Sequence, residues 1–211
     1  MKHWTKGLAL STLMACTALP ALATETISTV VIDGYPARAL WVQEFTDFFI
    51  PEVDKRLAET GNYAMNWQES YGGSIVKPKG VLEGVQLGLG DIGIVTTIFH
   101  SSKLPSQGIA AVTPFVSTDA RAVAKAVDEI AREFPAMQNE FSKQNQVYLA
   151  TGVVLDTYQI FSSKDVSTIS DLEGLKIRVA GATAAEVASA LGATPVQMPI
   201  NQVYNALQTG L

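Results

Sequence analysis

Arg178 lies in an apolar stretch, Leu175–Ala180, whose alternation of residue types is typical of a β-strand. The apolar residues of that stretch share one face, and Arg178 falls on the other, close to Gly181. A guanidinium remains protonated and offers a planar fork of N–H donors, which matches both oxygens of a carboxylate. Arg178 is therefore a candidate to bind the carboxylate of a ligand. The alternative is an exposed arginine that pairs with Asp171 or Glu173.

Two side chains with hydroxyl groups lie at the ends of other predicted strands. Thr96 follows a predicted strand at Asp91–Val95, so its hydroxyl can bind a ligand oxygen or cap the next turn. Tyr35 lies in the loop after a predicted strand at Ile27–Ile32, where it can form the wall of a site or pack on Pro36. We include both residues among the predicted ligand-binding residues.

Short apolar strands alternate with longer helical patterns along the chain. Strands are predicted at residues 27–32, 64–68, 91–95, 147–154, 158–162 and 175–180. Helices are predicted at residues 39–57, 81–86, 120–134, 182–191 and 202–208, the last with Asn201 as its N-cap. The alternation predicts an α/β fold with mostly parallel sheets, in which ligands bind at the carboxyl ends of the strands.

Residues 1–23 have the features of a secretory signal peptide. Lys2 and Lys6 precede an uncharged run that ends in a small-residue pattern at Ala23, after which we place cleavage. The run is short for a membrane span, which needs about 20 apolar residues. A second interpretation makes Cys16 the lipidated residue of a lipoprotein signal. We therefore predict export to the periplasm, with no direct membrane insertion after cleavage.

Composition excludes several classes of protein for the cleaved chain. Cys16 is the only cysteine, so disulfides, thiolate nucleophiles and cysteine-bound metals would all be absent. Loss of Lys2 and Lys6 lowers the count of Lys and Arg from 15 to 13, against 20 Asp and Glu, so the formal net charge becomes −7. An acidic chain is a poor candidate for binding nucleic acid. A site for an anion must therefore create its own local positive field.

The sequence gives little support to an exported enzyme. His100 is the only histidine after residue 3, so a histidine cluster for a metal is not available. The stretch around Ser74 does not fit the nucleophile elbow of Ser-His-Asp hydrolases. We predict a protein that is not an enzyme and holds no cofactor and no metal, and we keep an exported enzyme as the less favoured alternative.

Three linked blocks of sequence, Asp171–Val179, Leu191–Pro199 and Val203–Gly210, resemble the DctP-like solute-binding proteins of TRAP (tripartite ATP-independent periplasmic) transporters. A more diffuse similarity covers Gly80–Gly93, so the resemblance extends over nearly the whole chain after the signal peptide. It implies a two-lobed periplasmic-binding-protein-like clamp, with a first lobe at residues 24–154 and the start of a second at 155–211. Because members of this family are longer, it also implies a C-terminally truncated chain with an incomplete second lobe.

The resemblance also implies which residues face the cleft between the lobes. Arg178 would hold the ligand carboxylate, and Asn201 would lie near it. Tyr158 occupies a position where several relatives carry a second arginine, so this chain departs from that pattern and a ligand with one carboxylate becomes as plausible as a diacid. Tyr158 can instead donate a hydrogen bond or present a flat apolar face.

The resemblance predicts an extracytoplasmic receptor that captures a small organic anion and delivers it to the membrane permease subunits of a TRAP transporter. A binding protein of an ATP-driven importer, or the sensing domain of a receptor, is the alternative with the same clamp architecture. Lobes of this kind close around a ligand by a hinge motion.

Overall fold

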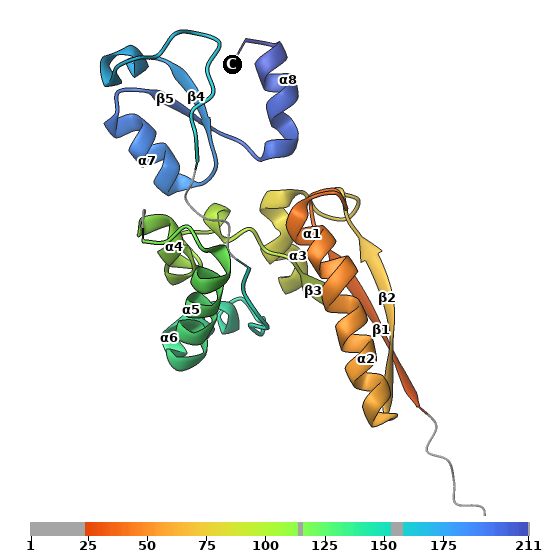
Figure 1. The fold of residues 1–211 in the computed structure, drawn as a ribbon. Coiled ribbons are helices and arrows are strands. Elements are labelled where there is room, and N and C mark those ends of the chain that lie inside the picture. Colours follow the sequence, from red (N-terminus) through yellow and green to blue (C-terminus); the bar gives the residue numbers. More distant parts are fainter. Residues whose placement is uncertain (1–23, 114–115, 153–157, 211) are drawn as a thin grey trace, which may run out of the picture.

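The computed structural model describes residues 24–113, 116–152 and 158–210. The predicted signal peptide at residues 1–23, the alternative lipidation of Cys16 and the predicted lobe boundary between residues 154 and 155 lie outside these described residues. Two groups of elements, each built on a parallel sheet, form the two lobes (Figure 1).

The first lobe contains, in chain order, β1 (Glu25–Ile32), α1 (Leu40–Glu44), the π-helix η1 (Phe45–Phe49), α2 (Ile50–Thr60), β2 (Tyr63–Ser70), η2 (Pro78–Gly80), α3 (Val81–Gln86), β3 (Ile92–Gly93), η3 (Thr97–Phe99), η4 (Pro105–Gly108), α4 (Ile109–Val112), α5 (Ala120–Glu133) and α6 (Pro135–Ser142). The second lobe contains η5 (Ile169–Leu172), β4 (Lys176–Val179), α7 (Ala182–Ala190), β5 (Thr194–Gln197), η6 (Ile200–Gln202) and α8 (Val203–Gln208).

The sheet of the first lobe has the strand order β2-β1-β3, and both pairings are parallel. β1 pairs with β2 along its whole length, from Glu25 opposite Tyr63 to Ile32 opposite Ser70. The last residues of β1, Val31 and Ile32, are fully buried, because β3 pairs with them on the second edge. β1 is therefore central and apolar at its carboxyl end, as expected for a strand covered on both sides.

The helix predicted at residues 39–57 forms as three consecutive segments, α1, η1 and α2. Pro51 lies in the first turn of α2, directly after helical residues, and its missing N–H leaves one backbone acceptor of the preceding turn without a donor. The change of helix type occurs just before it, in η1, where Phe45 and Phe49 stack with their ring centroids 4.5 Å apart. The helix type thus changes just before Pro51, and the chain continues without a loop.

In the second lobe, β4 and β5 pair in parallel and α7 packs against them. Its core consists of buried residues on these elements and on η5, namely Leu172, Val179, Ala185, Ala188 and Ala193. Leu175 and Ile177 pack against this core, which confirms the predicted apolar face of the strand. Arg178 lies on the opposite face and is half-buried.

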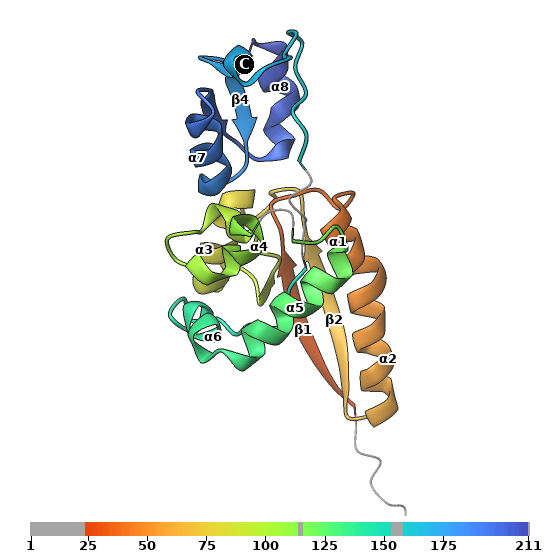
Figure 2. The same ribbon diagram turned by 60° about the vertical axis from the view of Figure 1, so that its left-hand side comes forward.

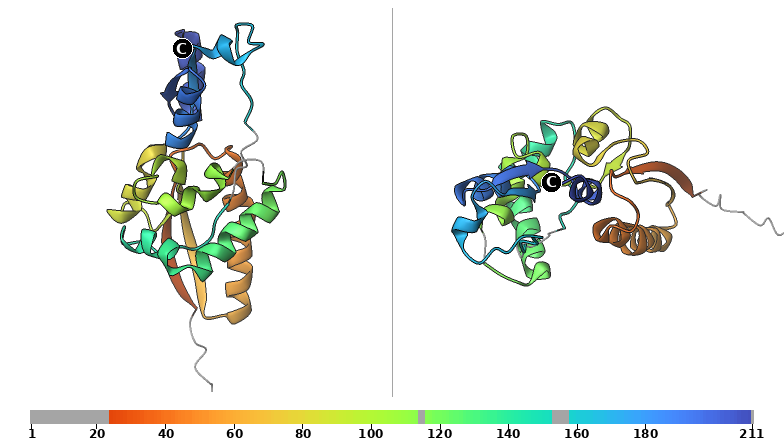
Figure 3. Two further views of the ribbon diagram at one scale, coloured as in Figure 1. Left: turned by 90° about the vertical axis from the view of Figure 1, so that its left-hand side faces the viewer. Right: turned by 90° about the horizontal axis from the view of Figure 1, so that it is seen from above.

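The carboxyl ends of both sheets point toward the junction of the lobes. The arrow of β2 points toward the second lobe in Figure 1, and the arrow of β4 points toward the first lobe in Figure 2. Seen from above, β4, β5 and α7 lie over the α4 side of the first lobe, away from α2 (Figure 3). Contact is close at Gly181, where an added Cβ would lie 2.8 Å from the carbonyl oxygen of Ile98 in η3.

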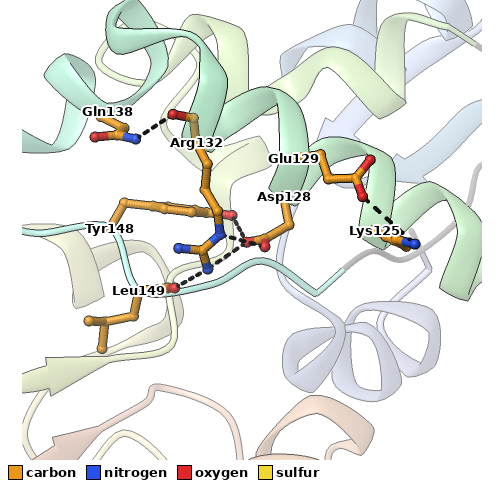
Figure 4. A network of polar contacts seen from close by, with 7 residues as sticks. All are labelled: Lys125, Asp128, Glu129, Arg132, Gln138, Tyr148 and Leu149. Carbon is orange, nitrogen blue, oxygen red and sulfur yellow. Dashed lines mark hydrogen bonds and ion pairs between the residues drawn. The ribbon is translucent and has the colours of Figure 1, made fainter.

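Two predicted strands are not strands in the structure. Residues 147–152, the described part of the predicted strand at 147–154, are irregular, and so are residues 158–162. Contacts with α5 hold the first of these segments (Figure 4): Tyr148 donates from its hydroxyl to Asp128 Oδ1 at 2.7 Å, and Arg132 donates to the Leu149 carbonyl at 2.9 Å. The backbone carbonyl of Leu149 is therefore bound to a side chain instead of a neighbouring strand.

Gly34 provides a test of packing beside the carboxyl end of β1. A Cβ at Gly34 would overlap the backbone of Lys77 and Pro78, and backbone atoms cannot move aside by a change of rotamer. We expect Gly34→Ala to lower the free energy of unfolding by about 2–3 kcal/mol, measured by urea denaturation. Gly108→Ala is the matched control, because a Cβ there meets nothing within 4 Å and its φ is −87°. Equal stability of the two variants would contradict this packing.

Candidate ligand-binding site

Arg178 projects from β4 toward the segment that follows β5. Its Nε donates to the carbonyl oxygen of Met198 at 2.9 Å, which orients the guanidinium plane. Asp171, the partner proposed in the alternative interpretation, instead accepts hydrogen bonds from the backbone N–H groups of Ser167 and Thr168. Among the described residues, the two terminal nitrogens of Arg178 have no hydrogen-bond partner. These donors can therefore serve a ligand.

Tyr35 lies at the junction of the lobes, with only 4% of its surface exposed. Burial raises the pKa of its hydroxyl to about 12, while the nearby charge of Arg178 and the hydroxyl of Thr96 act in the opposite direction. Tyr158 is also close enough to influence the same pKa. The structure thus brings together four of the five predicted site residues. Arg178 comes from β4, Tyr35 from the loop after β1, Thr96 from the position before η3, and Tyr158 from the segment that enters the second lobe.

The four residues differ in exposure. Tyr158 has 64% of its surface exposed, and Thr96 is half-buried at the start of η3 without capping that turn through its side chain. Asn201, the fifth predicted residue, is exposed in η6, the turn between β5 and α8. Its predicted N-cap role is wrong, because α8 begins after Gln202, which has no side-chain capping bond. Asn201 is thus left to face solvent.

Asp33 is a buried residue of this region that sequence reasoning missed. It follows β1 directly and has no exposed surface. Its Oδ1 accepts from the backbone N–H of Tyr35 at 2.8 Å, and its Oδ2 accepts from the indole N–H of Trp41 at 3.3 Å. Burial raises the pKa of this carboxyl to about 6, although these hydrogen bonds oppose the shift. Its position at the carboxyl end of a predicted strand was the available signal.

Tyr71 adds a second buried hydroxyl near Asp33. Thr46, in η1, shares a hydrogen bond of 3.1 Å with the Tyr71 hydroxyl and donates to Glu69 Oε2 at 2.6 Å. Burial raises the pKa of Tyr71 to about 12, so this hydroxyl stays neutral at ordinary pH. Aromatic hydroxyl groups thus accompany the carboxylates of Asp33 and Glu69 at the carboxyl ends of β1 and β2.

His100 lies in a separate cluster with Glu83 and Lys103. Lys103 Nζ donates to Glu83 Oε1 at 2.7 Å, and His100 Nδ1 lies 3.8 Å from the same oxygen. Burial lowers the pKa of His100, against the attraction of the Glu83 charge. The imidazole is therefore neutral at ordinary pH and takes part in packing beneath η3.

The described ranges contain no group of three or more His, Cys, Asp or Glu side chains arranged to hold a metal ion. In the same ranges, no helix has both the length and the apolar character that crossing a bilayer requires. A shallow hollow lined by Ala136, Asn139, Ser142 and Lys143 lies on α6. None of its lining residues belongs to the group around Arg178. We place the candidate site at the lobe junction, where that group lies.

The raised pKa of Asp33 predicts a pH-dependent stability. The folded chain holds the Asp33 proton more tightly than the unfolded chain, so this group's contribution to stability falls as the pH rises from about 4 to about 6. Asp33→Asn removes that decline. We expect the free energy of unfolding of the variant, relative to the parent, to increase by about 2–3 kcal/mol across this range. Urea denaturation at several pH values measures it, and a difference that stays constant with pH would contradict the assignment.

The family model for bacterial extracellular solute-binding proteins, family 7, matches residues 51–211. A monocarboxylate 2-oxoacid-binding periplasmic protein of Nostoc sp. is 27% identical over 209 residues, covering 95% of this chain and 57% of the relative. A solute-binding protein of Sulfitobacter sp. is 45% identical over 56 residues, covering 26% of this chain and 17% of the relative. The chain therefore spans a little over half the length of the Nostoc protein.

Solved structures show the same fold. A TRAP solute-binding protein from an unidentified marine microbe, in complex with 3-hydroxybenzoate, aligns with a TM-score of 0.67 at 18% identity, covering 89% of this chain and 56% of that chain. An extracytoplasmic solute receptor of Bordetella pertussis that binds pyroglutamic acid aligns with a TM-score of 0.65 at 24% identity, covering 87% and 58%. The predicted two-lobed α/β fold with parallel sheets is confirmed.

These relatives are solute-binding receptors, which agrees with the prediction of a protein that is not an enzyme. The predicted resemblance to TRAP solute-binding proteins is likewise confirmed. The chain belongs to the bacterial extracellular solute-binding proteins of family 7.

Proposed function

We propose that the protein is a periplasmic receptor that captures a small organic acid and delivers it to a TRAP-type permease without chemical change. The single observation that carries this proposal is the placement of Arg178 at the lobe junction. Its Nε is bound to Met198, and its terminal nitrogens have no partner among the described residues. A half-buried guanidinium of this kind is a strong receptor for a carboxylate, because both partners are charged and the geometry is bidentate.

The surroundings of Arg178 support a ligand with one carboxylate. Burial raises the pKa of Tyr35 to about 12, so its hydroxyl is a neutral hydrogen-bond partner. Tyr158 and Thr96 add two further hydroxyls near Tyr35. This set of neutral groups suits the hydroxyl, carbonyl or ring portion of a small acid better than a second carboxylate.

The relatives point to the same class of ligand. The Nostoc protein is named for monocarboxylate 2-oxoacids, and the two solved structures hold or bind 3-hydroxybenzoate and pyroglutamic acid. Each of these compounds carries a single carboxylate on a different body. The shared feature is the carboxylate, which Arg178 would bind in this chain. The neutral side chains around Arg178 would contact the rest of the ligand.

Substitution of Arg178 tests the proposed function. Purified protein is titrated by calorimetry with pyroglutamate, 3-hydroxybenzoate and pyruvate, and with 2-pyrrolidinone and phenol as analogues without a carboxylate. We expect an acid to bind the parent and neither analogue to do so. Arg178→Ala should weaken acid binding at least about 100-fold, because it removes a charge-assisted pair. Arg178→Lys should restore little, because a point charge cannot form the bidentate contact.

Lys176→Ala is the matched control for this experiment. Lys176 lies two residues earlier on the same face of β4, carries the same charge and is exposed. This variant should retain the affinity of the parent. A parent that binds an acid and an Arg178→Ala variant that binds it equally well would disprove the carboxylate assignment.

A further inference from the structure

We propose that Asp33 and Trp41 are positioning residues that fix Tyr35 as a second, neutral hydrogen-bond donor to the carboxylate held by Arg178. This inference rests on the proposed function, and it adds the buried residues that prepare the site before a ligand arrives. It is based on a closed set of contacts that joins all three side chains. Neither Asp33 nor Trp41 was among the residues predicted from the sequence.

The backbone around Tyr35 is held on several sides. Asp33 Oδ1 accepts from the Tyr35 N–H at 2.8 Å, and the Tyr35 carbonyl accepts from the Gly72 N–H at 2.8 Å. The Asp33 N–H donates to the Ser70 carbonyl at 3.2 Å, which continues the β1–β2 pairing past Ile32. Gly34, between them, lies so close to the Pro78 backbone that a Cβ does not fit. The loop has little room to rearrange.

The ring of Tyr35 is held by Trp41. The two rings are nearly perpendicular, at 89°, with their centroids 4.9 Å apart, which is a favourable edge-to-face geometry. The indole N–H of Trp41 donates to Asp33 Oδ2 at 3.3 Å, so the carboxylate that binds the Tyr35 backbone also orients the ring that packs on Tyr35. Asp33 uses one oxygen for each task, and a residue with a single acceptor cannot perform both.

The Tyr35 ring is thus held in advance at the lobe junction, where Gly181, just after the Arg178 strand, meets the Ile98 carbonyl of η3 and where the Arg178 charge acts on the Tyr35 hydroxyl. A donor that is already fixed costs little conformational entropy when the ligand binds, which improves affinity. Burying a carboxylate without a cationic partner normally destabilises a fold. Asp33 has no exposed surface and no ion pair with any described residue, so its carboxylate contributes to orientation of the site more than to stability.

A double-mutant cycle tests the inference. The dissociation constants for pyroglutamate, 3-hydroxybenzoate and pyruvate are measured for the parent, Tyr35→Phe, Asp33→Asn and the double variant, with thermal unfolding of each recorded in parallel. We expect each single variant to weaken binding about 10-fold, and the double variant to weaken it by about the same factor, because both changes act through one hydroxyl. Asp47→Asn is the control, since Asp47 is an exposed aspartate of η1.

The outcomes separate this inference from the proposed function. If the folded parent binds none of the three acids, the proposed function is wrong and the inference fails with it. If the parent binds an acid and Asp33→Asn binds equally well, or if the double variant loses affinity about 100-fold, Asp33 does not act through Tyr35. Should Asp33→Asn fail to fold, Trp41→Phe replaces it, because it keeps an aromatic side chain, though a smaller one, and removes the indole N–H to Asp33. It should show the same loss and the same non-additivity with Tyr35→Phe.

Discussion

Parallel pairing is the constraint from which the geometry of this protein follows. Because β1 pairs in parallel with both β2 and β3, the residues that follow these strands emerge at one edge of the sheet. β4 and β5 do the same in the second lobe, and the two edges face each other. Tyr35, Thr96 and Arg178 are separated by long stretches of sequence, yet each comes after or near the end of a strand, and so they meet.

The junction combines Arg178 with neutral hydroxyl groups in a protein of acidic composition. Long-range repulsion of an anion is offset locally by Arg178, whose partner in the fold is the uncharged carbonyl of Met198. Asp33 lies behind Tyr35, where it binds a backbone N–H and an indole. Its carboxylate is thus used inside the protein, and Arg178 remains available for a ligand.

The local sequence pattern was sufficient to predict some strands of this protein and misleading for others. The strand around Arg178 was predicted correctly because Leu175, Ile177 and Val179 must be buried on one face, and alternation fixes which side chains face away. The segment at residues 147–152 also contains apolar residues, but Asp128 on α5 binds the Tyr148 hydroxyl and Arg132 binds the Leu149 carbonyl. Strand formation needs a partner strand, and the local sequence carries no information about which groups will be nearby.

The sequence by itself determined the α/β class and most of the strands and helices, and it singled out Arg178 as the candidate carboxylate-binding residue, because hydrophobic periodicity and residue type are local properties. The tertiary structure alone decided which hydroxyls lie beside Arg178, since Tyr35 and Thr96 come from other strands. It also revealed Asp33, whose role depends on Trp41 eight residues later in another element. Burial and hydrogen-bond partners are set by packing between distant segments, and a linear pattern does not encode those distances.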